Sequence, residues 1–161
     1  MGTTGYWLAA KADPADLAGA PELAALDLTF APLVDGWVDA VIVGMPHPLQ
    51  PDDLLEAFAR RLGLAAAVAF VMDSDLGVFG GIDPSGTTHS VGVNKAAFDS
   101  YGIPDQGIFD AAHLERLFLW SAHAPAPLDP ARLAEIVGQQ WTFADEGLAA
   151  IGEAVGLPVR F

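Results

Sequence analysis

The segment from residue 64 to residue 93 constrains the fold most strongly, because it predicts three consecutive strands separated only by short turns. The strands are expected at 66–73, 77–82 and 89–93, and the first follows the longest apolar run of the chain, Leu64 to Met72. Asp83-Pro84-Ser85-Gly86 has the signature of a type I turn. Such short connections join antiparallel neighbours, since a parallel pair needs a crossover of about a dozen residues. The segment therefore predicts a β-meander.

The N-terminal half predicts further strands and one well-defined helix. Strands are expected at 6–10 and 36–44, with a short one at 28–30, and Asp13-Pro14 is typical of a helix start. Between residues 51 and 62, the spacing of the Leu and Phe residues forms one apolar stripe, with acids at the beginning, Arg at the end and Gly63 behind it. This pattern predicts a helix over 51–62.

The last third of the chain predicts helices. Residues 108–123 are apolar on nearly all sides, Asp129-Pro130 begins a second helical pattern, and a third follows Thr142 and stops at Gly156. At 161 residues the chain is expected to be a single domain, 1–161. We predict an α+β fold with a mainly antiparallel sheet of about five strands, helices packed on one face and a helical C-terminal third.

The charge of the chain limits its partners. Twenty-one acidic residues stand against seven Lys and Arg, for a net charge of −14. A field of this sign repels phosphate backbones and anionic lipid surfaces, and it accelerates encounter with basic partners. We therefore expect no nucleic acid and no membrane as partner. A basic protein partner competes with a simpler explanation, in which the acids only keep a chain with 52% hydrophobic residues soluble.

Residue types that are missing exclude several chemistries. The chain has no Cys, which excludes disulfides, thiolate metal sites and Cys nucleophiles. It contains no Gly-rich phosphate loop and no Gly-x-Ser-x-Gly. The N-terminus lacks a basic region, and the apolar piece at 7–10 is too short for a signal peptide. We expect a cytoplasmic protein that needs no cofactor and carries no recognisable catalytic residue.

Two functional hypotheses from different classes remain. The first is a small acidic binding protein that masks or inhibits a basic protein, by the physics that immunity proteins and nucleic-acid mimics use. Its partner-binding residues are expected in loops, at helix starts and at one surface aromatic: Asp35, Asp39, Asp52, Asp53, Glu56, Asp73, Asp75 and Trp141.

The second hypothesis is a small metal-assisted hydrolase. Asp73-Ser74-Asp75 follows a hydrophobic strand, and its carboxylates could share a divalent cation with His89. The same three residues are also typical of a hairpin turn, and that interpretation is favoured. A third possibility is a ligand-binding or scaffold domain whose acidity serves only solubility.

Overall fold

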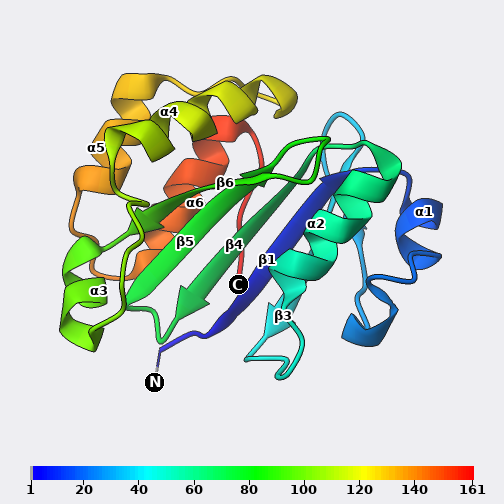
Figure 1. The fold of residues 1–161 in the computed structure, drawn as a ribbon, viewed down its shortest axis with the longest axis horizontal. Coiled ribbons are helices and arrows are strands. Elements are labelled where there is room, and N and C mark those ends of the chain that lie inside the picture. Colours follow the sequence, from blue (N-terminus) through cyan, green and yellow to red (C-terminus); the bar gives the residue numbers. More distant parts are fainter. Residues whose placement is uncertain (1) are drawn as a thin grey trace.

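The computed structural model describes residues 2–161, and within them one six-stranded antiparallel sheet forms the centre of the molecule (Figure 1). The strands lie in the order β2-β3-β1-β4-β5-β6. Their bounds are β1 Gly5–Lys11, β2 Ala31–Pro32, β3 Trp37–Val43, β4 Ala66–Met72, β5 Leu76–Ile82 and β6 Thr88–Val93. The helices are α1 Pro14–Ala18, α2 Pro51–Leu62, α3 Lys95–Tyr101, α4 Ala111–Trp120, α5 Pro130–Gly138 and α6 Ala144–Val155, with short 3₁₀ turns η1 Ala24–Leu26 and η2 Ser121–His123.

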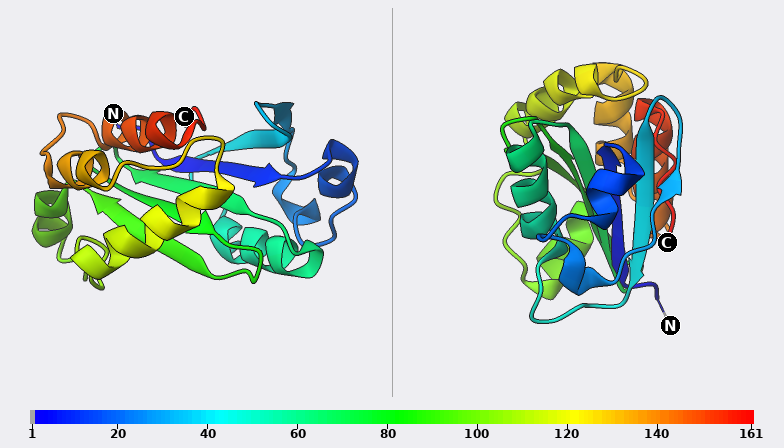
Figure 2. Two further views of the ribbon diagram at one scale, coloured as in Figure 1. Left: turned by 90° about the horizontal axis from the view of Figure 1, so that it is seen from above. Right: turned by 90° about the vertical axis from the view of Figure 1, so that its right-hand side faces the viewer.

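The two faces of the sheet each carry a hydrophobic core. We call the face that bears Tyr6 and Leu8 the front face, and the face that bears Trp7 and Ala9 the back face. Successive residues of a strand point to opposite sides, so β1, which is buried almost throughout, contributes to both cores. Figure 2 shows α2 and α6 on opposite sides of the sheet.

The front face is covered by α2 and by the segment around α1. Pro51 occupies the first turn of α2, two acids follow it, and Gly63 ends the helix with a φ of 63°. This left-handed conformation suits a residue without a Cβ. Leu55 and Phe58 of α2 are fully buried against the front side of the sheet. The helix thus begins and ends where the sequence predicts.

The back face is covered by α4, α5 and α6. Their buried side chains pack on Trp7 and Phe79. Trp120 of α4 lies directly over Gly81 of β5, where a Cβ would come within 2.1 Å of the indole Cδ2 atom. The indole nitrogen of Trp120 donates a hydrogen bond to the carbonyl of Ile82 at 3.0 Å. A glycine at position 81 is therefore required for the close approach of α4 to the sheet.

The predicted α+β class, the mainly antiparallel sheet and the helical C-terminal third are confirmed. The prediction placed the helices on one face, whereas the structure places them on both. The cause is visible in β1, whose run of consecutive apolar residues has two sides to cover. The short strand expected at 28–30 is found slightly later, as β2 at Ala31–Pro32, and it makes the sheet six-stranded.

One additional helix and one shifted helix start differ from the expectation. The structure adds α3, and it starts α4 at Ala111 rather than at residue 108. The reason lies at the edge of the sheet, where the backbone N–H of Gly92 in β6 donates to the carbonyl of Ile108 at 3.0 Å. Residues just before α4 are thus used to pair with the edge strand. Within residues 2–161, the longest helices have 12 residues, and none is long and apolar enough to cross a bilayer.

Candidate functional site

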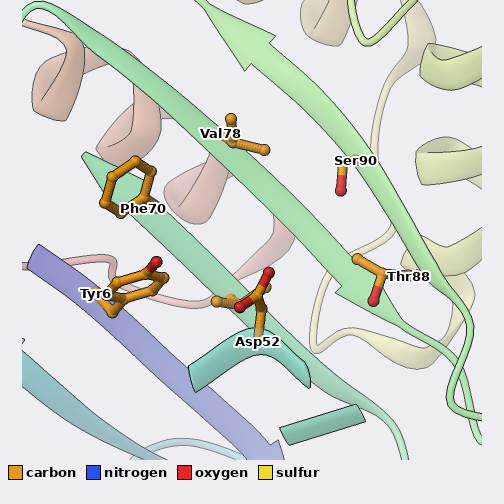
Figure 3. Close-up of a pocket in the computed structure, with 7 residues that line it drawn as sticks. Tyr6, Asp52, Phe70, Val78, Thr88 and Ser90 are labelled. Carbon is orange, nitrogen blue, oxygen red and sulfur yellow. The ribbon is translucent and has the colours of Figure 1, made fainter. Parts of the chain in front are cut away.

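A pocket with a volume of about 160 Å³ opens on the front face beside α2 (Figure 3). It exists because α2 packs on β1 and β4 and leaves the β5 and β6 side of this face open (Figure 1). Gly80 of β5 deepens the space, since a Cβ there would lie 2.8 Å from Thr88 and 3.2 Å from Val68. The lining residues come from five elements: Tyr6, Asp52, Val68, Phe70, Val78, Thr88 and Ser90.

One side of the pocket is apolar. Val68 and Phe70 of β4 and Val78 of β5 lie on the same face of the sheet because they sit at alternating positions of paired strands. The rings of Tyr6 and Phe70 lie against each other with their centroids 4.7 Å apart. This wall can hold an aliphatic or aromatic group in contact with carbon atoms on several sides.

The other side of the pocket is polar and unsatisfied. The Oδ1 atom of Asp52 is buried and has no hydrogen-bond partner within residues 2–161. Tyr6 lines the same pocket, and its side chain is only 6% exposed. In Figure 3, the Asp52 carboxylate lies between Tyr6 and the pair of hydroxyl residues on β6. Buried polar atoms are normally paired, so the Asp52 oxygen lacks the partner that such an atom usually has.

The β6 hydroxyls add acceptors to this polar side. Thr88 donates its hydroxyl proton to a carboxylate oxygen of Glu56 in α2. Because that proton is committed to Glu56, the Thr88 oxygen has lone pairs left to accept a hydrogen bond from a ligand. Ser90 lines the pocket one pleat further along the strand.

The charged residue among those that line the pocket is Asp52. Burial raises the pKa of Asp52, backbone N–H groups of Asp52 and Asp53 offset part of this rise, and the neighbouring carboxylate of Asp53 adds to it. Burial, followed by the charges of Asp52 and Asp53, raises the pKa of Tyr6 to about 12, so its phenol keeps its proton at neutral pH. No Lys or Arg belongs to the residues that line the pocket. A cation with hydrogen-bond donors is the ligand class that this environment favours.

The structure brings three of the predicted partner-binding residues together on α2. Asp52 lines the pocket, Asp53 follows it at an exposed position, and Glu56 binds Thr88 at the pocket rim. Asp35 lies elsewhere, exposed in the turn between β2 and β3, where it takes a φ of 55°.

Asp39 is fully buried and does not present its charge to a partner. It accepts hydrogen bonds from the indole of Trp7 at 2.8 Å and from the Arg160 guanidinium at 2.9 and 3.0 Å. This predicted site residue therefore joins the sheet to the C-terminal segment. An acid in the middle of an apolar strand points to such a buried pair, but the sequence does not reveal which base supplies it.

Asp73 and Asp75 belong to the tight turn between β4 and β5. Asp73 and Ser74 have φ values of 52° and 58°, and Asp75 accepts a hydrogen bond from the Tyr101 hydroxyl at 2.6 Å. Trp141 is half-buried, and its indole nitrogen donates to the carbonyl of Ile136 at 3.0 Å. The positive φ values of Asp73 and Ser74 agree with the turn interpretation of residues 73–75, and both aspartates are exposed there.

The metal-site alternative loses its geometry in this fold. His89 pairs with Gly81 across the sheet, and Gly81 lies six residues from Asp75, which is about 20 Å along β5 at the usual rise per residue. The ring of His89 instead contacts Asp83 at 3.0 Å. Among residues 2–161, no three His, Asp or Glu side chains are grouped to hold a metal ion.

Sequence reasoning missed most of the pocket. The sequence pattern places Tyr6 in an apolar strand and gives no functional role to Thr88 or Ser90. One signal was present: two hydroxyl residues at alternating positions of β6 mark a strand side that is not sealed by a helix. Their meeting with Asp52 depends on the packing of α2 and is not encoded in any local pattern.

Comparison with protein-family models, with curated protein sequences and with solved structures gives no match for this chain. The function is therefore argued from the chemistry of the pocket and the distribution of charge.

Proposed function

We propose that this protein is an acidic binding protein that attaches to a basic protein through the front face beside α2. The observation that carries the proposal is the buried, unpartnered carboxylate oxygen of Asp52 in a pocket without a basic lining residue. Such a group is costly to bury alone and becomes favourable when a cation reaches it.

The rest of the charge supports the same proposal. Within residues 2–161, four ion pairs join an acid to Lys or Arg, and the chain has 21 acids in all. Most carboxylates are thus left to act on an approaching molecule. Their long-range attraction raises the association rate with a basic surface, and the effect falls with added salt.

The experiment compares two variants with the same change in charge. Asp52→Asn, Asp53→Asn and Glu56→Gln are combined on α2 and at the pocket rim. The control combines Glu→Gln at three exposed positions outside this face, namely Glu115, Glu135 and Glu153. Wild type and both variants are immobilised, captured proteins are identified by mass spectrometry, and their association rates are measured between about 50 and 500 mM NaCl.

The proposal expects a basic partner that binds wild type and the control variant, with a rate that falls steeply with salt. The α2 variant should lose most of this binding. Equal capture by both variants, or a partner without a basic surface, would overturn the proposal. A uniform loss in both variants would show that net charge alone acts, and this would also count against docking at α2.

A further inference from the structure

We propose that the pocket between Tyr6 and Asp52 receives a single lysine side chain from the basic partner. This inference rests on the proposed function and names the group that the site recognises. Besides Asp52 of α2, it uses the apolar wall of the pocket and the Tyr6 side chain, which lines the pocket and is only 6% exposed.

The pocket fits both parts of a lysine side chain. The four-carbon stem is apolar and can lie along Val68, Phe70 and Val78. The volume of about 160 Å³ suits one side chain and leaves no room for a folded element. The aromatic rings of Tyr6 and Phe70 also present surfaces that attract a cation.

The polar end of the pocket matches an ammonium group. An ammonium has three donors and no acceptor, and it needs acceptors arranged around a point. Asp52 offers a free carboxylate oxygen, Thr88 offers an oxygen whose proton is held by Glu56, and Tyr6 offers its hydroxyl oxygen. These acceptors come from α2, β6 and β1, so the fold gathers them around one place.

The occupant is a partner's lysine rather than a segment of this chain. Within the described residues, Arg61, Arg132, Arg160 and Lys95 are paired with acids elsewhere. Arg60 donates to the carbonyls of Ser85 and Gly86. Lys11 lies in β1 on the side of Trp7 and Ala9, which is the back face, and Arg116 belongs to α4, which covers that face.

The test uses small probes, so it does not require the partner. Nα-acetyl-lysine methylamide, whose side-chain ammonium is free, is titrated into the isotope-labelled protein. The protein signals are followed by heteronuclear NMR. N-acetyl-norleucine methylamide, which has a similar stem without the ammonium, is the probe control. We expect saturable shifts at Tyr6, Thr88 and Ser90 with the lysine probe and much smaller shifts with the norleucine probe.

Matched variants separate the pocket from the general field. Asp52→Asn should weaken binding of the lysine probe about tenfold or more, because it removes a charged hydrogen bond from a partly buried site. Asp53→Asn removes the same charge from an exposed neighbour and should change the affinity less than about twofold. Tyr6→Phe removes only the hydroxyl and should weaken binding by an intermediate factor. Thermal unfolding of each variant verifies that it folds.

Each outcome bears on one of the two proposals. Equal effects of the Asp52 and Asp53 variants, equal binding of both probes, or shifts away from the pocket would overturn the lysine inference. Capture of a basic protein that is unaffected by Asp52→Asn would also overturn it, while the proposed function would stand. Probe binding in the pocket without any basic protein partner would refute the proposed function and assign the pocket to a free amine.

Discussion

Removal of the Arg160 guanidinium tests how the C-terminal segment is held. Arg160 donates two hydrogen bonds to Asp39, which is fully buried in β3, and Trp7 donates a third. In Arg160→Met the carboxylate keeps only the bond from Trp7. The methionine retains most of the apolar stem, so the substitution removes charge and donors rather than packing.

The expected loss follows from the burial of the pair. Removing one partner of a buried ion pair costs about 3–5 kcal/mol, because the other charge is left uncompensated. The side chain of Arg160 is 55% exposed, so water replaces part of the lost interaction, and we expect about 2–3 kcal/mol. For a chain of this size, that loss lowers Tm by about 6–9 °C.

Urea unfolding followed by far-ultraviolet circular dichroism measures the effect. Arg132→Met is the control, since Arg132 and Glu135 form an exposed pair on one helix and should cost less than about 0.5 kcal/mol. A double-mutant cycle with Asp39→Asn should give a coupling energy of about 1–2 kcal/mol. A coupling near zero, or an Arg160 variant as stable as the Arg132 variant, would refute the reasoning.

Three further predictions concern single groups. In a Tyr101→Phe background, the ultraviolet titration of Tyr6 should have its midpoint near pH 12, and a midpoint near 10 in folded protein would contradict this. The stabilisation linked to the raised pKa of Tyr6 is present below pH 10.0 and is lost as the pH rises through 12. Burial opposes ionisation of Asp83, but hydrogen bonds from Ser85, His89 and backbone N–H groups lower its pKa to about 2, so its stabilisation is present above about pH 4 and is lost toward pH 2. Asp83→Asn should therefore flatten the dependence of the unfolding free energy on pH in this range, and an unchanged slope would exclude the carboxylate as its source. Gly81→Ala should cost about 2–3 kcal/mol in urea unfolding, because its Cβ would overlap Trp120, and a loss below about 0.5 kcal/mol would show that the indole moves freely.

The sequence predicted those parts of the fold that depend on neighbours along the chain. Helix α2 begins at Pro51 and ends before Gly63. Asp13 and Asp129 accept hydrogen bonds from the backbone of the helices they precede. These helix starts and stops are predictable because each capping residue acts within one turn of the helix.

The sequence could not predict what depends on distant partners. Arg160 meets Asp39 across 121 positions, and no local pattern announces the pair. The hairpin turn at Asp35-Gly36 did carry a usable signal, since both residues adopt positive φ and Asp-Gly favours such turns. The pocket could not be foreseen, because it depends on how α2 lies across the strands.

The two covered faces of the sheet contain different chromophores. All four tryptophans of the chain, Trp7, Trp37, Trp120 and Trp141, belong to the back core or pack against it, whereas Tyr6 belongs to the front core. Indole emission therefore reports on one layer, and phenol absorbance in the Tyr101→Phe background reports on the other. Coincident melting of the two signals would establish cooperative unfolding of both layers, and their separation would reveal a front layer that opens by itself.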